Sequence, residues 1–158
     1  MSDNNHGHKP HLLRLPRISD NRGSLTFLQH PLTAPFEIKR LFYLYGMPDG
    51  AQRGGHAHIR ESQLLIAVAG SFDVKVFDGQ TWETFTLDRP DIALLLPPPY
   101  WRELHDFTPG AVCLTLSSTE FDPEEYLSPI GDFLDYLAGH PDAQSGGKTT
   151  LVPHQDKC

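Results

Sequence analysis

Short apolar or alternating runs, separated by turn residues, fill the middle of the chain. Between positions 72 and 77, Val74 and Val76 alternate with polar residues, and Asp78-Gly79 then predicts a hairpin whose return strand covers 82–87. Further strands are expected at 24–28, 36–45, 63–69, 92–96 and 111–116. This number and spacing of strands is typical of an all-β sandwich or barrel.

Helical signals come late in the chain. Asp122 offers an N-cap, with proline and two acids after it, and apolar residues then recur at helical spacing from position 130 to 137. Pro129 is expected to break or split this helix near its start. Residues 1–10 and 140–158 are polar and predict a flexible N-terminus and a disordered tail, which leaves one domain over 11–139.

Composition narrows the class of protein. The net charge of -7 argues against a nucleic-acid surface, whereas a few arginines in a cleft could still hold a small anionic ligand. No apolar run approaches the roughly 18 residues of a membrane span, and the polar start lacks a signal-peptide core, so we expect a cytoplasmic protein. Cys113, in an apolar run, is expected to be buried, and Cys158 to be a loose thiol.

The segment Arg53-Gly54-Gly55-His56-Ala57-His58 is the strongest chemical signal. Side chains at i and i+2 of a strand point to one face, so His56 and His58 are expected to enter the same space. Two imidazoles in a partly desolvated pocket can bind a metal or transfer protons near neutral pH.

The nearby residues favour proton transfer over metal binding. Glu61 lies three positions beyond His58, and on a continuing strand it would face away from both imidazoles. Gln63 is a poor ligand for a divalent transition metal, and His105 is only a distant third imidazole. We therefore expect no bound metal.

Arginines and aromatic residues flank the histidine pair in the sequence. Arg40 and Arg53 are expected to bind a diphosphate. Tyr43 is expected to lie near the imidazoles, and Trp101 to pack near a base. Each of these residues has a plainer interpretation, as a solvated strand arginine or a core aromatic. His105 is interpreted as structural.

Taken together, these motifs resemble the dTDP-4-keto-6-deoxyhexose 3,4-ketoisomerases, which are metal-independent cupins of deoxysugar biosynthesis. The resemblance runs from about Ile18 to Leu127. It is carried, in chain order, by Asp20-Asn21-Arg22-Gly23-Ser24-Leu25, Ile38-Lys39-Arg40-Leu41-Phe42-Tyr43, the Arg53 to His58 string, Gln63, Gly70-Ser71 and Trp101-Arg102-Glu103-Leu104-His105-Asp106-Phe107.

The resemblance implies a jelly-roll cupin barrel with a short C-terminal helix, a dimer that exchanges N-terminal strands, and no cofactor. The implied reaction moves a keto group between C4 and C3 of a dTDP-sugar. His58 is then the expected base at C3, with His56 and Tyr43 carrying protons. Arg40, Arg53, Gln63 and Trp101 are the expected substrate-binding residues.

Four positions depart from the family pattern: Phe42, Gly55, Ser62 and Arg102. They leave open the sugar, the nucleotide and the configuration at C4 of the product. Three other functions also stay open: a 3,5-epimerase-like cupin, which usually needs an acid beside its catalytic histidine, a metal-dependent cupin, and a non-catalytic sugar-binding module.

Overall fold

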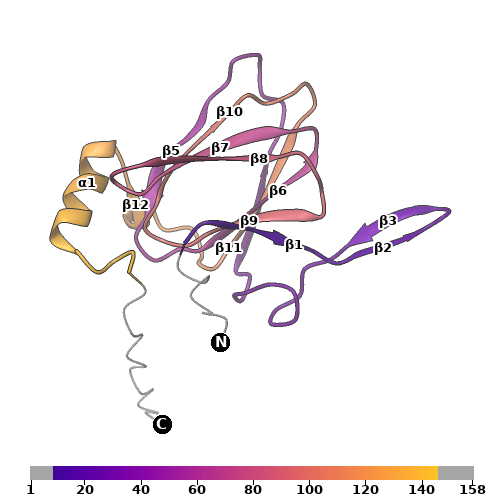
Figure 1. Cartoon of the computed structure of the whole chain (residues 1–158), viewed down its shortest axis with the longest axis horizontal. Helices are drawn as coiled ribbons and strands as arrows, with labels where there is room; N and C mark the ends of the chain where they lie inside the picture. Colours follow the sequence, from indigo (N-terminus) through magenta and orange to yellow (C-terminus); the bar gives the residue numbers. More distant parts are fainter. Residues whose placement is uncertain (1–8, 146–158) are drawn as a thin grey trace, which may run out of the picture.

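Two antiparallel five-stranded sheets form the body of the protein in a computed structural model that describes residues 9–145 (Figure 1). The first sheet has the order β1 (His11–Arg14), β9 (Ile92–Leu96), β6 (Gln63–Ala69), β11 (Val112–Ser117), β4 (Arg40–Leu44). The second has the order β12 (Tyr126–Leu127), β5 (Arg53–His58), β10 (Trp101–His105), β7 (Phe72–Phe77), β8 (Trp82–Leu87). The predicted hairpin at Asp78-Gly79 joins β7 to β8, with Phe77 opposite Trp82.

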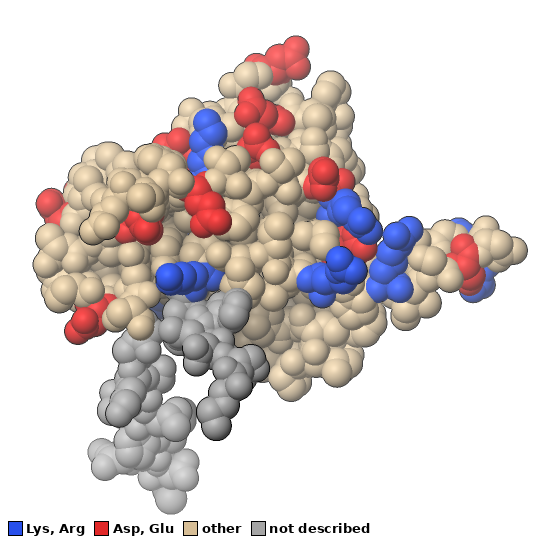
Figure 2. All heavy atoms as spheres, in the orientation of Figure 1, with Lys and Arg blue, Asp and Glu red and all other residues tan. Residues whose placement is uncertain are grey.

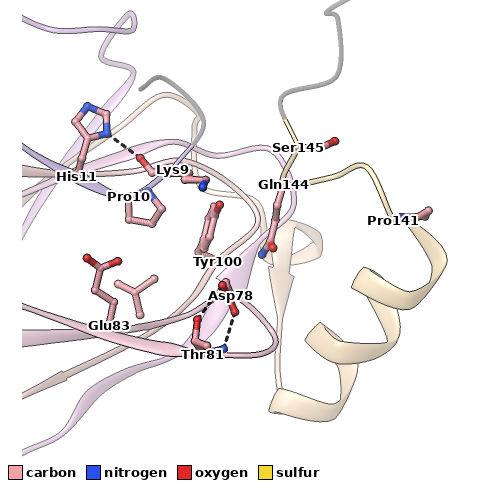
Figure 3. A pocket seen from close by; sticks show the side chains of 11 residues that line it. Lys9, Pro10, His11, Asp78, Thr81, Glu83, Tyr100, Pro141, Gln144 and Ser145 are labelled. Carbon is pink, nitrogen blue, oxygen red and sulfur yellow. Dashed lines mark hydrogen bonds between the residues drawn. The ribbon is translucent and has the colours of Figure 1, made fainter. Parts of the chain in front are cut away.

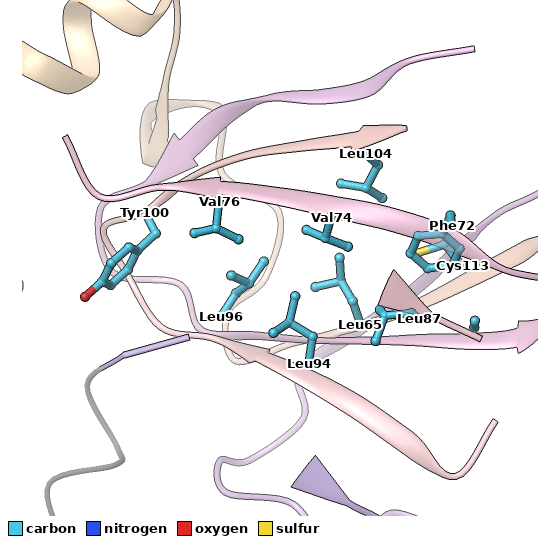
Figure 4. Packing of buried hydrophobic residues seen from close by; sticks show 11 residues of the cluster. Leu65, Phe72, Val74, Val76, Leu87, Leu94, Leu96, Tyr100, Leu104 and Cys113 are labelled. Atoms are coloured by element: carbon cyan, nitrogen blue, oxygen red, sulfur yellow. The ribbon is translucent and has the colours of Figure 1, made fainter. Parts of the chain in front are cut away.

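The main core lies between the two sheets. Alternation along β7 turns Phe72, Val74 and Val76 inward, where they meet Leu94 and Leu96 of the first sheet (Figure 4). The remaining buried members are Leu65, Ala67, Leu87, Tyr100, Leu104 and Cys113. Cys113 is fully buried, as its apolar run predicts.

Each sheet is also partly covered on its outer face. A second apolar cluster, centred on Leu64, Ile66 and Leu95, packs beneath the segment that contains Phe36 and Ile38. A third cluster packs α1 (Ile130–Gly139) onto the second sheet through Phe133 and its neighbours. Coverage on both faces explains why β6 and β9 have continuous apolar runs rather than alternating ones.

The predicted break in the C-terminal helix is confirmed. Asp122 caps a short 3-10 helix, Pro123–Glu125, through its side chain, the strand β12 follows, and Pro129 stands at the N-cap of α1. Strand β12 was not expected from the sequence. It is only two residues long, and its pairing with β5, Tyr126 opposite His58, depends on residues far away in the chain.

A separate hairpin projects from the body as an arm (Figure 1). It consists of β2 (Arg17–Asp20) and β3 (Gly23–Thr26), which pair with each other. Its apolar side chains, Ile18 and Leu25, lie opposite one another and are 62% and 56% exposed. Basic side chains lie at the base of the arm and along it, with acidic ones among them (Figure 2). A two-stranded ribbon of this kind is marginal by itself.

The seven predicted strand ranges all correspond to observed strands, whereas β1, β2 and β10 were not predicted, and the largest boundary error lies at 36–45. The predicted strand 36–45 begins only at Arg40, because Phe36 and Ile38 pack across the outer face of the first sheet.

Residues 140–145 form hydrogen-bonded turns, and Gln144 donates to the Pro99 carbonyl. The predictions for residues 1–8 and 146–158, including Cys158, lie outside the described residues. Within residues 9–145, no helix is both long enough and apolar enough to cross a membrane.

Candidate active site

A distortion in β5 turns the side chains of Arg53 and His56 toward the same space between the sheets. Gly54 and Gly55 both have positive φ, +81° and +75°, and the pairing with β10 shifts register opposite them. On a regular strand Arg53 and His56, three positions apart, would face opposite sides. The bulge adds a residue, so both side chains reach one cavity.

This cavity has a volume of about 200 Å³. It carries polar side chains from five strands on an otherwise apolar wall. The side chains or backbone of Phe42, Leu44, Arg53, Gly54, His56, Gln63, Leu65, Arg102, Leu104, Thr115 and Tyr126 line it. Apolar walls with a few convergent polar groups are typical of small-molecule sites.

The two imidazoles lie together, as their i, i+2 spacing predicts. Their ring centroids are 4.9 Å apart with the planes perpendicular. The ring of Tyr126 packs on both, 4.9 Å from His56 and 4.5 Å from His58. His56 lines the cavity, whereas His58 lies behind it with no exposed surface.

Glu61 also faces the histidines, and the expectation that it points away is wrong. Its Oε2 lies 3.3 Å from His58 Nε2, and its side chain is 1% exposed. The reason is that β5 ends at His58 and the chain turns before β6 begins at Gln63, so strand alternation does not extend to Glu61. Buried Glu125 holds this turn by accepting hydrogen bonds from the backbone N–H groups of Arg60 and Glu61.

A buried polar network continues from Glu61 across the sheets. The Gln63 side-chain amide donates to Glu61 Oε2 at 2.5 Å, and its oxygen accepts from Arg102 Nη1 at 2.6 Å. Arg102 is 2% exposed and also donates to the Tyr100 carbonyl. Arg102, one of the four positions that differ from the family pattern, therefore places a buried cation on the wall of the cavity.

Burial and positive charge keep both imidazoles neutral. Burial, with Arg102 acting in the same direction, lowers the pKa of His56 from 6.5 to about 4. Burial also lowers the pKa of His58, and Arg102, His56 and Arg40 lower it further. The pKa of Arg102 falls to about 10 on burial, with Glu61 opposing the fall, so this side chain stays charged at neutral pH. A neutral imidazole is the form that accepts a proton.

The lowered pKa of His56 predicts a loss of stability in mild acid. In the unfolded chain His56 is protonated below about pH 6.5, whereas in the folded protein it is protonated only below about pH 4. The free energy of unfolding should therefore fall as the pH drops from 6.5 to 4, by at most about 3 kcal/mol from this group. Urea titrations at pH 7 and pH 5 measure it. His56→Asn should lose less stability between the two pH values than the wild type, and equal losses would contradict the assignment.

The two flanking arginines occupy different settings. Arg53 is exposed and lines the cavity. Arg40 donates to Glu61 Oε1 at 2.9 Å and lies over the rings of Phe42 and Phe121. Arg53 is thus free to meet a ligand at the cavity, whereas part of the Arg40 guanidinium is already bound to a buried carboxylate.

The structure does not bring Tyr43 and Trp101 to this cavity. Tyr43 is 56% exposed on the outer side of β4, so the expectation that it lies close to the imidazoles is wrong. Arg40 points inward, and alternation therefore puts Phe42, not Tyr43, on the cavity side. Trp101 packs with Phe133 beneath α1 and donates to Glu103, so it does not line this cavity, and its packing near a nucleotide stays a prediction.

Three side chains of the site were missed by the sequence analysis. Tyr126 comes from β12, a strand with no sequence signal, and Glu61 was assigned to the wrong face. Arg102 was noted only as a departure from a family pattern, although its position on β10 opposite His56 makes it a neighbour of the histidine pair. Only the position of Arg102 could have been derived from a correct strand pairing.

A larger hollow of about 890 Å³ lies elsewhere, between the β7–β8 hairpin, Tyr100 and residues 141–145 (Figure 3). Two carboxylates line it, those of Asp78 and Glu83, and Asp78 accepts hydrogen bonds from Thr81 and from the backbone of its own turn. Asp78 and Thr81 stabilise the hairpin turn, and among the described residues His11 is the one imidazole in the lining, so the smaller cavity beside the histidine pair is the better candidate for chemistry. Within the described part of the chain, no three His, Cys, Asp or Glu side chains are grouped so that they could hold a metal.

Residues 8–138 match the protein family FdtA, described as WxcM-like, C-terminal. The chain belongs to this family. It is 34% identical, over 127 residues that make up 80% of this chain and 91% of the other, to a TDP-4-oxo-6-deoxy-alpha-D-glucose-3,4-oxoisomerase from Aneurinibacillus thermoaerophilus. The resemblance to the 3,4-ketoisomerases is thereby confirmed.

Solved structures agree with this membership. QdtA, a sugar 3,4-ketoisomerase from Thermoanaerobacterium thermosaccharolyticum in complex with TDP, superposes with a TM-score of 0.81 at 30% identity, over 84% of this chain and 96% of that one. WlaRB, a TDP-quinovose 3,4-ketoisomerase from Campylobacter jejuni, gives a TM-score of 0.76 at 40% identity, over 80% and 97%. The predicted all-β cupin class with a short C-terminal helix is confirmed.

Proposed function

We propose that this protein is a 3,4-ketoisomerase acting on dTDP-4-keto-6-deoxyglucose. The observation that carries the proposal is the pair of neutral imidazoles, His58 buried and His56 half-buried, beside a cavity that also bears Arg53 and Arg102. Membership in a family with 3,4-ketoisomerase members supports the reaction class over a 3,5-epimerase. The buried acid beside His58 removes one argument against an epimerase, so product analysis must separate the two.

The reaction needs a base and a cation but no change of oxidation state overall. His58 takes the C3 proton, and the electrons of that bond form a C3–C4 double bond as negative charge develops on the C4 oxygen. Arg102, charged and on the cavity wall, stabilises this enediolate. A proton is then returned to C4, the C3 hydroxyl gives up its proton and the C4 oxygen gains one, which leaves the keto group at C3 and a hydroxyl group at C4.

Access to His58 involves Tyr126 in this proposal. The sugar ring occupies the cavity beside His56, and the Tyr126 ring, which covers both imidazoles, turns aside so that C3 meets His58. His56 and Tyr126 are then the groups placed to carry protons to and from the sugar oxygens. Phe42, in the inward position next to Arg40, supplies an apolar wall only.

Incubation with dTDP-4-keto-6-deoxyglucose, followed by NMR of the product, tests the proposal. A 3-keto product with solvent deuterium incorporated at C4 in D₂O is expected, and activity should survive a chelator. A product inverted at C5 would favour the epimerase, loss of activity with the chelator a metal-dependent cupin, and binding of TDP without turnover a binding module. The same spectra would show the configuration at C4.

Arg53→Ala should weaken substrate binding more than catalysis. Arg53 lies exposed at the cavity, where its guanidinium can hold the diphosphate through two N–H groups. Phosphate contacts far from C3 are equally strong in the ground and transition states, so we expect a raised KM and a nearly unchanged kcat. Steady-state kinetics measure both. A variant that loses kcat at unchanged KM would place Arg53 at the reacting atoms instead.

The exposed arm supports the proposal of a homodimer that exchanges N-terminal segments. The arm leaves Ile18 and Leu25 largely exposed, and the outer face of the first sheet exposes Leu41, Tyr43 and Val68. A partner copy would cover both surfaces, and would give Tyr43 a role in the interface. Light scattering at micromolar concentration should show a dimer for the wild type and a shift toward monomer for Ile18→Lys. A wild-type monomer would overturn this part of the proposal.

The cytoplasmic location and a place in deoxysugar biosynthesis for polysaccharides or glycosides belong to the same proposal. The proposed substrate, a keto sugar activated by a nucleoside diphosphate, supports both the location and the biosynthetic role. Neither a nucleic acid nor a membrane enters the proposed reaction.

A further inference from the structure

Glu61 is a buried carboxylate in which both oxygens have hydrogen-bond donors. Its Oε1 accepts from Arg40 at 2.9 Å and from Thr119 at 2.6 Å. Its Oε2 accepts from Gln63 at 2.5 Å and lies 3.3 Å from His58 Nε2. A buried carboxylate in this position affects the imidazole next to it, because the medium screens charge poorly there.

The contacts of the imidazole select its tautomer. With the proton on Nδ1, the Nε2 lone pair could accept from the Gln63 amide at 3.4 Å, but it would also face a charged carboxylate oxygen at 3.3 Å. The buried Nδ1–H would then have no acceptor, because Nδ1 has no hydrogen-bond partner. With the proton on Nε2, the ring donates to Glu61 and only one lone pair is left unpartnered. The second tautomer satisfies the contacts better.

We infer that Glu61 is a positioning residue for His58. It fixes the Nε2–H tautomer, leaves Nδ1 as the basic nitrogen, and stabilises the imidazolium that forms when Nδ1 takes a proton. The tautomer follows from the contacts alone, whereas the consequence for turnover rests on the proposed function. Arg40 then serves this pair by holding the carboxylate, in addition to any contact with a ligand.

The variant Glu61→Gln gives a sharp test because its two amide ends differ. The oxygen should turn to Arg40, which is charged and a donor only, and the NH₂ group to His58, at the cost of the contact with the Gln63 amide, which is also a donor. The imidazole should then switch to the Nδ1–H tautomer, in which Nε2 accepts. Two-bond ¹H–¹⁵N spectra of histidine-labelled protein distinguish the tautomers, and His58→Asn assigns the signals.

The value of kcat should depend on which tautomer His58 adopts. We expect kcat of Glu61→Gln to fall on the order of 10²-fold or more, with KM little changed, because the basic nitrogen is now protonated. Thr119→Val is the matched control. It removes another hydrogen bond to the same carboxylate without touching His58, so the Nε2–H tautomer should persist and kcat should stay within a few-fold of wild type.

The outcomes separate the two proposals. A wild-type His58 in the Nδ1–H form, or a Glu61→Gln variant that folds with its tautomer and kcat unchanged, would overturn the positioning role. An Nε2–H wild type that switches in the variant supports that role even if no keto sugar is turned over, in which case the proposed function alone fails. Circular dichroism and urea unfolding of both variants establish that the proteins compared are folded.

Discussion

The variant His58→Asn is expected to lose about 10²–10⁴-fold in kcat while it still folds and binds TDP, the usual contribution of a general base. The loss follows from chemistry, since an amide has no nitrogen basic enough to take the C3 proton. Binding should survive because Arg53, at the cavity, is untouched. Single-turnover kinetics measure the chemical step, and calorimetry with TDP measures the binding.

His105→Asn is the control for this experiment. His105 lies at the end of β10, bound to Glu103, and it does not line the cavity. It should therefore turn over substrate at the wild-type rate. If His58→Asn were as active as His105→Asn, then His58 would not be the base, and His56, the imidazole on the cavity wall, would take its place as the candidate.

The strand pattern and the paired imidazoles could be predicted because both depend on local rules. Alternation along β7, the turn at Asp78-Gly79 and the i, i+2 spacing of His56 and His58 each involve residues within one or two strands. The same rule, applied to Arg40 on β4, places Phe42 rather than Tyr43 on its face. The error at Tyr43 was therefore avoidable from the sequence alone.

The remaining differences between the expected and the observed site arise from tertiary structure. Glu61 faces inward because β5 ends at His58 and the side chain of Glu125, sixty-four positions later, holds the turn. Tyr126 reaches the imidazoles through a two-residue strand that exists only by pairing with β5. Trp101 is covered by α1, whose docking on the second sheet no local pattern reveals. Each case depends on a contact between segments distant in the chain.

Gly54→Ala is expected to cause the largest loss of stability among these substitutions. At φ +81° any side chain is strained, which costs about 1–2 kcal/mol. A Cβ atom would also lie 2.8 Å from the Arg102 carbonyl oxygen, a backbone atom that cannot move without disturbing β10. We expect a total loss of roughly 3 kcal/mol or more in the free energy of unfolding, measured in urea.

Gly55→Ala separates the two causes. Gly55 has nearly the same φ, +75°, but an added Cβ would meet nothing within 4 Å, so this variant should lose only the strain, about 1–2 kcal/mol. Equal losses in the two variants would mean that close approach to β10 is unimportant. The bulge at Gly54-Gly55 turns Arg53 and His56 to one cavity, and only a Cβ at Gly54 would push it away from β10. The folded fraction of Gly54→Ala should therefore also have a raised KM, as Arg53→Ala does, whereas that of Gly55→Ala should not.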